Sequence, residues 1–373
     1  MSNYASHPWS PLARLLEEGV QQGVYTAATA AVGLKGEKLW EGAAGRVSRE
    51  PDAAAAALNT VFDLASLTKP LATALALMLL AAQGRITLET TLGEVLREKW
   101  LPSDKRALTL LSLLAHQAGL PAWRPFYETI LAAPEAARGG LPRRLAAAAA
   151  LEYPPGSRTL YSDLGYLLLQ AVVEAAAGRD LDSFCRGEIY RPLGLETLGF
   201  CPRRRPGGDK LSFAATETGL IPGRSASGEV HDENAWAAGG VAGHAGLFGT
   251  AAEVFQLLSA LYRTYQGEAV GPLVPAVVRG FLTPAPGGGR TPGFDTPGGE
   301  LSHRSAGRFF SARSVGHLGF TGVSFWLAPD TGQMVVLLTN RVHLGREDKT
   351  GIQRFRPLFH EAASRALGIL SEQ

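Results

Sequence analysis

Residues 62–82 read Phe-Asp-Leu-Ala-Ser-Leu-Thr-Lys-Pro-Leu-Ala-Thr-Ala-Leu-Ala-Leu-Met-Leu-Leu-Ala-Ala, a short extended segment followed by a long apolar run. The run predicts a helix from about Leu67 to Ala82 that ends near Gly84. Its most apolar part, Pro70 to Ala82, is shorter than the roughly 20 residues that span a bilayer. We therefore expect this helix to be buried in the core of a folded domain.

Outward from this helix, the chain predicts strands at both ends. A helix over Pro11–Gln21 precedes two strands, Ala27–Leu34 and Lys38–Gly45, which form a hairpin. Near the C-terminus, three more strands precede a closing amphipathic helix. These elements are expected at Ser314–Phe320, Val323–Ala328, Met334–Asn340 and, for the helix, Gln353–Leu367.

The middle of the chain carries helical periodicity that proline and glycine interrupt. Thr250 and Glu253 predict a capping box that starts a helix running to about Tyr262. Residues 202–228 are expected to form a surface loop, and the Gly/Pro-rich residues 283–299 a mobile one. Further helices are expected at Leu108–His116, Tyr161–Ala177 and Leu181–Tyr190.

This order of elements favours an α+β (mixed α/β) fold. The terminal strands most economically share one antiparallel sheet flanked by helices, and the central helices form an inserted all-helical lobe. We expect a single domain over residues 1–373, with a sheet subdomain from 1–66 and 300–373 and a mainly helical lobe from 67–299. A cleft between the sheet and the lobe is the natural place for a site.

Composition excludes several classes of protein. Hydrophobic residues make up 46% of the chain and the net charge is +2, which argues against disorder and against a nucleic-acid binder. The first twelve residues lack the pattern of a signal peptide, so we expect a cytoplasmic protein with no membrane partner. Cys185 and Cys201 are expected to be reduced and buried.

Ser66 and Lys69 are the first pair of residues that could do chemistry. A spacing of three at a helix start places them on one face. Of the seven lysines, Lys69 alone faces an apolar run. Burial there is expected to lower its pKa, so that Lys69 can accept the proton of the serine hydroxyl. The alternative is a serine helix cap beside a lysine whose stem covers apolar surface.

The triplet Tyr161-Ser162-Asp163 follows a Pro-rich turn at residues 154–157. We expect the turn to project the phenol of Tyr161 from a loop end, where a nearby lysine would favour its use as a base or proton relay. Asp163 could hydrogen-bond to a substrate or to Lys69. In the alternative interpretation, Ser162 or Asp163 only caps a helix.

The segment Val315 to Gly322 places His317 between glycines on a predicted strand. Glycines let a ligand approach the backbone closely, and one strand N–H could stabilise an oxyanion. An extended substrate could also pair with this strand edge. The alternative is a glycine-bent strand that carries a solvated histidine.

In this order, the three motifs resemble the serine penicillin-recognising superfamily, whose members carry S-x-x-K at a helix start. The resemblance is closest to the class C β-lactamase and DD-peptidase-like branch, the β-lactamase-related serine hydrolases, and spans roughly residues 10–365. It implies a β-lactamase/transpeptidase-like fold and an enzyme without a cofactor or metal. It also rests on Phe62–Ala65, His116–Leu120, Gly243–Phe248 and Leu337–Arg341.

The resemblance implies a role for each motif residue. Ser66 would be the nucleophile that forms an acyl-enzyme, Lys69 its base or proton shuttle, and Tyr161 the proton donor to the leaving group. Backbone N–H groups of Ser66 and Phe320 would form the oxyanion hole. The substrate would be a small molecule, peptide or ester, held by Asp163, His317, Gly319 and Phe320.

Two motif positions depart from the family. Asp163 stands where the family most often has Asn, and this carboxylate could pair with Lys69 and keep it charged. His317-Leu318-Gly319 replaces the Lys-Thr-Gly of class C β-lactamases and resembles some DD-carboxypeptidases, D-amino-acid peptidases and esterase-like members. A histidine is largely neutral at pH 7, and Leu318 supplies no hydroxyl.

The segment Gly228 to Ala235 also resembles part of one branch of the family. His231 and Asp232 could suggest a metal site, but no third ligand follows at a recognisable spacing. We expect this loop to shape the cleft instead, with His231 or Asn234 hydrogen-bonding the lobe together.

The leading hypothesis is therefore a serine hydrolase of amides or esters, similar to a β-lactamase or DD-carboxypeptidase. A carboxylesterase is the second possibility. A catalytically silent ligand sensor is the third, and the intact Ser66, Lys69 and Tyr161 argue against it. The oligomeric state is not indicated by the sequence.

The neutral third motif predicts weak dependence on a free substrate carboxylate, and hence poor activity on penicillins. Initial rates on a chromogenic cephalosporin and on a short p-nitrophenyl acyl ester provide the comparison. Efficient cephalosporin turnover without ester cleavage would contradict this prediction.

Overall fold

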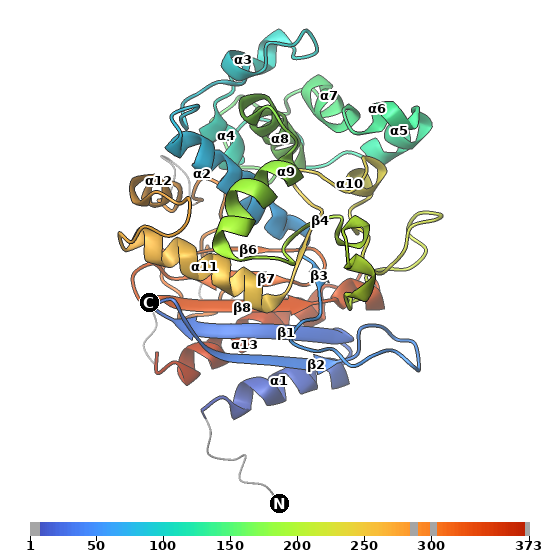
Figure 1. Cartoon of the computed structure of the whole chain (residues 1–373), viewed down its shortest axis with the longest axis vertical. Coiled ribbons are helices and arrows are strands. Elements are labelled where there is room, and N and C mark those ends of the chain that lie inside the picture. Colours follow the sequence, from blue (N-terminus) through green and yellow to red (C-terminus); the bar gives the residue numbers. More distant parts are fainter. Residues whose placement is uncertain (1–7, 284–289, 299–303, 370–373) are drawn as a thin grey trace, which may run out of the picture.

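A five-stranded antiparallel sheet runs through one half of the molecule. The computed structural model describes residues 8–283, 290–298 and 304–369, and the strand order of this sheet is β2-β1-β8-β7-β6 (Figure 1). Ala30 of the N-terminal hairpin lies opposite Leu337 of the C-terminal strands, so the expected shared sheet is confirmed. The strands are β1 (Ala27–Leu34), β2 (Glu37–Gly45), β6 (Val315–Leu318), β7 (Ser324–Leu327) and β8 (Gln333–Thr339).

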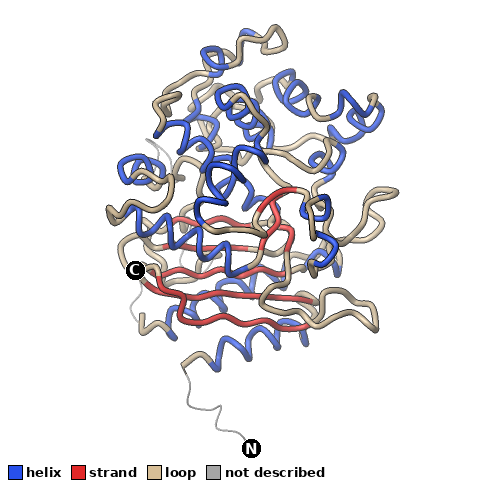
Figure 2. The backbone as a smooth tube through the Cα atoms, viewed as in Figure 1, coloured by secondary structure: helices blue, strands red, loops and turns tan. Residues whose placement is uncertain are grey.

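Helices cover both faces of this sheet. The terminal helices α1 (Ser10–Gln21) and α13 (Thr350–Ala366) pack on one face, and α11 (Ala251–Tyr265) packs on the other (Figure 2). Because side chains alternate along a strand, Val335 packs with the terminal helices and Val336 with the core that includes α11. Burial on both sides explains why β1 and β8 are so rich in apolar residues.

The other helices lie mostly beyond the β6 edge of the sheet (Figure 1). The bounds are α2 (Leu75–Ala82), α3 (Leu92–Val95), α4 (Leu110–Leu114), α5 (Phe126–Ala132), α6 (Glu135–Arg138), α7 (Leu141–Ala148), α8 (Asp163–Ala177), α9 (Leu181–Cys185), α10 (Glu233–Ala237) and α12 (Pro275–Phe281). The helix before Gly84 and the helices expected at Leu108–His116, Tyr161–Ala177 and Leu181–Tyr190 are present, with ends that differ by a few residues, whereas α3, α5, α6, α7, α10 and α12 were not expected.

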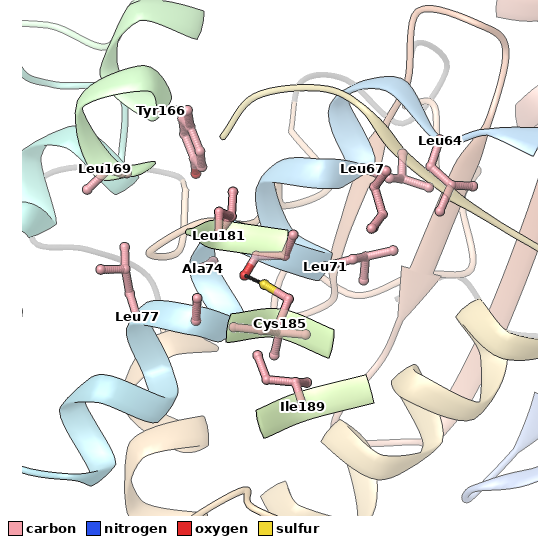
Figure 3. Close-up of a cluster of buried hydrophobic side chains, with 14 of the residues drawn as sticks. Leu64, Leu67, Leu71, Ala74, Leu77, Tyr166, Leu169, Leu181, Cys185 and Ile189 are labelled. Carbon is pink, nitrogen blue, oxygen red and sulfur yellow. Dashed lines mark hydrogen bonds between the residues drawn. The ribbon is translucent and has the colours of Figure 1, made fainter. Parts of the chain in front are cut away.

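The segment that precedes α2 is helical as well, but it is not a regular α-helix. Residues Ala65–Leu67 form a 3₁₀ turn and Lys69–Ala74 a π turn, and α2 continues from there. The carbonyl of Ala72 in the π turn accepts a hydrogen bond from the thiol of Cys185, within the buried cluster of Figure 3. By length and composition the helix Ala65–Ala82 could cross a membrane, but 83% of it is buried inside the protein, which is typical of a core helix.

A second, three-stranded sheet lies beside this helix and was not expected from the sequence. Its order is β3 (Phe62–Asp63), β5 (Leu247–Gly249) and β4 (Gly199–Phe200). Strands of two or three residues are too short to show a period-two pattern, so only the extended segment before Ser66 was predictable. The pairing of Asp63 with Phe248 brings the segment 243–248 next to the start of the buried helix.

The capping box expected at α11 is only half formed. Thr250 does accept a hydrogen bond from the N–H of Glu253, at 3.2 Å. The Glu253 carboxylate, however, accepts from the N–H groups of Glu196 and Thr197 instead of returning to Thr250. The same side chain therefore serves a tertiary contact, which local spacing does not reveal.

The loops and cysteines differ from expectation in three places. Within 202–228, Phe213 to Thr216 are buried, so that segment is only partly a surface loop. Residues 284–289 and 299 of the loop expected over 283–299, and the expected boundary at residue 300, lie outside the described residues. Both cysteines are free, but only Cys185 is buried, and Cys201 is half-buried.

Asn340, just after β8, ties the main sheet to two loops. Its side-chain oxygen accepts from the N–H groups of Thr26 and Ala27, at 3.1 and 2.8 Å. Its amide nitrogen donates to the carbonyl of Ala215 at 3.0 Å. Because Asn340 is buried, no water can replace these partners without a rearrangement.

Replacing this side chain is expected to destabilise the fold. Asn340→Ala leaves several buried backbone groups without a partner, which lowers the free energy of unfolding by about 3 kcal/mol. The midpoint of urea denaturation measures the effect. The exposed Asn59→Ala is the matched control and is expected to change stability by less than about 0.5 kcal/mol. Equal midpoints for the two variants would contradict the role assigned to Asn340.

Candidate active site

Ser66 lies on a tight turn between β3 and the buried helix. Ala65 adopts the left-handed conformation with φ +46°, which is uncommon for a residue other than glycine. The carboxylate of Asp63 holds this turn, because it accepts from the N–H of Ala65 at 2.8 Å and from the N–H of His231 at 2.6 Å. The turn leaves Ser66 partly exposed on an otherwise buried segment.

Lys69 lies directly beneath Ser66, as the three-residue spacing predicts. Its ammonium donates to the hydroxyl of Ser66 at 3.0 Å and to the carbonyl of His244 at 3.3 Å. It also forms an ion pair with Asp163 at 2.7 Å, so the expected Asp163–Lys69 pairing is confirmed. Lys69 is fully buried. Lys105 is buried too, although it was expected in a polar segment, and it pairs with Asp104.

The expected lowering of the Lys69 pKa is wrong. Burial does act in that direction, but attraction by Asp163 and Tyr161 outweighs it and raises the pKa of Lys69 above its usual value. Asp232 also interacts electrostatically with Lys69. Burial acts to raise the pKa of Asp232, but the contact with His244 outweighs burial and lowers this pKa to about 2. Lys69 is therefore an ammonium cation at neutral pH.

The second motif caps α8 through Ser162 and also places Tyr161 in the cleft. Ser162 caps α8 by accepting from the N–H of Gly165, and Tyr161 immediately before it lines the cleft. The ring of Tyr161 lies 4.6 Å from the Lys69 ammonium and 4.5 Å from the ring of His116. Burial raises the pKa of the phenol, and the Lys69 charge opposes that rise.

His317 is buried rather than solvated, so the alternative interpretation of the third motif is wrong. Burial lowers its pKa to about 4, which makes the imidazole neutral at pH 7, as expected from the sequence. Its Nδ1 lies 2.7 Å from the carbonyl of Leu318, a distance that suits an N–H donor. Its Nε2 is buried without a partner among the described residues and then carries a free lone pair.

The turn after β6 completes the opposite wall. Gly319 lies so close to Val323 and Leu64 that a Cβ at this position would clash, which explains the requirement for glycine. The N–H of Phe320 finds no acceptor within the described part of the chain. This turn lines a cleft of about 300 Å³ together with Ser66 and two other motif residues; the motif residues in it are Ser66, Tyr161, His317, Gly319 and Phe320.

The structure thus brings all seven sequence-predicted site residues together, with Lys69 and Asp163 forming the floor. Sequence reasoning did not single out Asp63, or the contact between Arg290 and Asp295, which flanks the cleft. Asp63 precedes Ser66 by three residues, but an acidic residue at that distance carries no signal of its own. Its role depends on the N–H of His231, which is remote in sequence.

The loop over residues 228–235 hydrogen-bonds to other segments, as expected, but none of its residues lines the cleft of Ser66. The side chain of Asn234 accepts from the N–H of Tyr127 at 2.7 Å and donates to the carbonyl of Arg124 at 2.9 Å. His231 lies 3.0 Å from Glu217. Both residues therefore connect this loop to other segments of the lobe.

Three side chains near Lys69 form the kind of cluster that can hold a metal ion. Ligand atoms of Asp163, Asp232 and His244 lie within 4.8 Å of one another. The Lys69 ammonium is in direct contact with Asp163, and it already supplies positive charge to this cluster. We assign no metal to it.

The model of the Beta-lactamase family matches residues 12–355, and the chain belongs to this family. A putative D-alanyl-D-alanine carboxypeptidase of Escherichia coli (strain K12) is 32% identical over 313 residues, which cover 77% of this chain and 70% of that protein. The resemblance drawn from the three motifs is therefore confirmed. The names of the relatives indicate a hydrolase.

Solved structures share the fold over nearly the whole chain. A penicillin-binding protein homologue from Caulobacter crescentus aligns with a TM-score of 0.73 and 19% identity, over 96% of this chain and 97% of its own. EstCE1, a hydrolase with promiscuous acyltransferase activity, aligns with a TM-score of 0.69 and 22% identity, over 94% and 98%. These likenesses confirm the β-lactamase-like α+β fold.

The ion pair with Asp163 predicts a measurable change in the titration of Lys69. Asp163→Asn removes the attraction and leaves the burial, so the pKa of Lys69 is expected to fall. NMR of protein labelled at the lysine side chains can follow it, because the chain has only seven lysines.

Asp104→Asn, which removes the partner of Lys105, is the matched control and leaves the titration of Lys69 unchanged. The Lys69 resonance is identified by its loss in Lys69→Arg. An unchanged titration midpoint in Asp163→Asn would show that Asp163 does not set the charge of Lys69.

Proposed function

We propose that this chain is a serine hydrolase that forms an acyl-enzyme on Ser66 with a small amide or ester substrate. The observation that supports this most is the 3.0 Å contact between Ser66 Oγ and the Lys69 ammonium, at the base of the cleft that Tyr161 lines. A hydroxyl with a neighbouring cation and a phenol has the groups that acyl transfer needs. The proposed reaction uses these side chains alone.

In the first step, Ser66 Oγ attacks the substrate carbonyl carbon. Because Asp163 keeps Lys69 protonated, Tyr161 is the proposed proton acceptor: the phenol first loses its own proton to bulk water, the Lys69 cation stabilises the resulting phenolate, and the phenolate oxygen then takes the serine proton. The carbonyl oxygen becomes an oxyanion, for which the N–H groups of Ser66 and Phe320 are the proposed donors.

The second step releases the leaving group. The tetrahedral intermediate collapses, the bond to the amine or alkoxide breaks, and Tyr161 returns the proton to that group. A water molecule then attacks the ester on Ser66, which frees the carboxylic acid and restores the serine hydroxyl. The same groups serve both halves of the reaction in reverse roles.

The substrate is proposed to be a short peptide or an ester. The names of the relatives favour a D-alanyl peptide, as in the carboxypeptidases, and EstCE1 supports a hydrolase in this fold with acyltransferase side activity. Carboxylesterase activity is the second candidate, because the neutral His317 with Leu318 offers neither a permanent charge nor a hydroxyl for a substrate carboxylate.

An acylating probe tests this proposal directly. Incubation with p-nitrophenyl acetate is expected to add one acetyl group to Ser66, detected by mass spectrometry, and to give a burst of p-nitrophenol. Ser66→Ala is expected to lose the adduct and at least about 10³-fold in rate, because the nucleophile is removed.

The exposed Ser103→Ala is the control and keeps both signals. An adduct that persists in Ser66→Ala would refute the assignment of the nucleophile. A stable adduct with no turnover on esters or D-alanyl dipeptides would favour the ligand sensor over the hydrolase.

A further inference from the structure

A buried arginine of α13 reaches the turn after β6. The Nη2 atom of Arg356 donates to the carbonyls of Gly319 and Val323, each at 2.8 Å. Arg356 is only 7% exposed, and across the described ranges no carboxylate pairs with it. Burial lowers the pKa of Arg356 to about 9, which still leaves a cation at neutral pH. The turn therefore has an uncompensated positive charge beside it.

The turn does not need this arginine for its own hydrogen bonds. The carbonyl of Gly319 also accepts from the N–H of Gly322 at 3.1 Å, and the carbonyl of Val323 accepts from the N–H of Gly319 at 2.8 Å. Burying an unpaired cation costs free energy, and an apolar side chain of similar size would fill the same space at lower cost. Packing alone therefore gives no reason for a guanidinium here.

Arg356 lines the same cleft as Ser66, and the peptide bond between Gly319 and Phe320 lies against its guanidinium. A trans peptide is planar, so its C=O and N–H point in opposite directions, and the described backbone has no cis peptide bond. Arg356 holds the C=O on one side. The N–H of Phe320 consequently points away from Arg356, and no acceptor for it is found among residues 8–283, 290–298 and 304–369.

A second arginine fixes the next peptide of the same turn. Nε of Arg341 donates to the carbonyl of Phe320 at 3.1 Å. With the carbonyls of both Gly319 and Phe320 held, the peptide planes on either side of the Phe320 backbone cannot rotate freely. The wall that faces Ser66 is thereby rigid before a substrate arrives.

We propose that Arg356 is a positioning residue for the oxyanion hole, which aims the Phe320 N–H into the cleft and polarises the Gly319–Phe320 peptide with its charge. The positive end of the polarised peptide is the N–H, so the effect strengthens as negative charge develops on the substrate oxygen. This inference rests on the proposed acyl transfer at Ser66.

The test compares Arg356→Met, Arg356→Lys and the control Arg354→Met, which removes an exposed arginine from the same helix. Stopped-flow acylation by p-nitrophenyl acetate gives the rate constant and KM, and a phenylboronic acid measures affinity for a tetrahedral anionic adduct on Ser66. Circular dichroism checks folding. If Arg356→Met does not fold, Arg356→Gln, which is also neutral, replaces it.

We expect the neutral variant to acylate about 10- to 100-fold more slowly, with KM within about twofold of wild type. Boronate affinity falls by a similar factor, Arg356→Lys recovers most of both losses, and Arg354→Met changes neither. Wild-type acylation and boronate affinity in a folded neutral variant would overturn this inference alone, and so would a loss confined to KM. Absence of any acylation of Ser66 in the wild type would overturn the proposed function together with it.

Discussion

The charge of one buried ammonium group, that of Lys69, organises the centre of this molecule. A cation that is fully removed from water must be neutralised and hydrogen-bonded, and here the partners are the Asp163 carboxylate, the Ser66 hydroxyl and the His244 carbonyl. These three groups come from the start of the buried helix, from α8 and from the segment before β5. The requirement to satisfy Lys69 therefore joins three distant parts of the chain around one serine.

The same constraint bears on the chemistry. With a neutral Asn at position 163, burial would lower the pKa of Lys69 and favour it as a base; with Asp163 the lysine is held as a cation. Charged side chains also hold the backbone on both sides of the cleft. Asp63 holds the turn at Ala65, and Arg341 and Arg356 hold the turn after β6. Rigid backbone on both sides of Ser66 suits a reaction whose charge develops on one oxygen.

Much of this arrangement was predictable. The hairpin Ala27–Leu34 and Lys38–Gly45, the C-terminal strands and the buried helix were predictable from apolar runs of suitable length between turn residues, and β1, β8 and α2 are indeed buried along most of their length. The short sheet of β3, β4 and β5 was not predictable, since its strands have two or three residues. The capping box at Glu253 was predicted wrongly for a related reason. The Glu253 carboxylate accepts from the N–H groups of Glu196 and Thr197, which are remote in sequence, and not from Thr250.

The sequence by itself determined the fold class, through the order of its strands and helices, and it named the candidate site residues, because Ser66-x-x-Lys69, Tyr161 and His317-x-Gly319 occur in the order that resembles the family. Only the tertiary structure decided the charge of Lys69 and the burial of His317. Whether Lys69 is a base or a cation depends on Asp163 at 2.7 Å, and whether His317 is solvated depends on the packing around it. A pKa reflects every charge and every layer of protein around a group, and neighbours that are remote in sequence leave no local pattern.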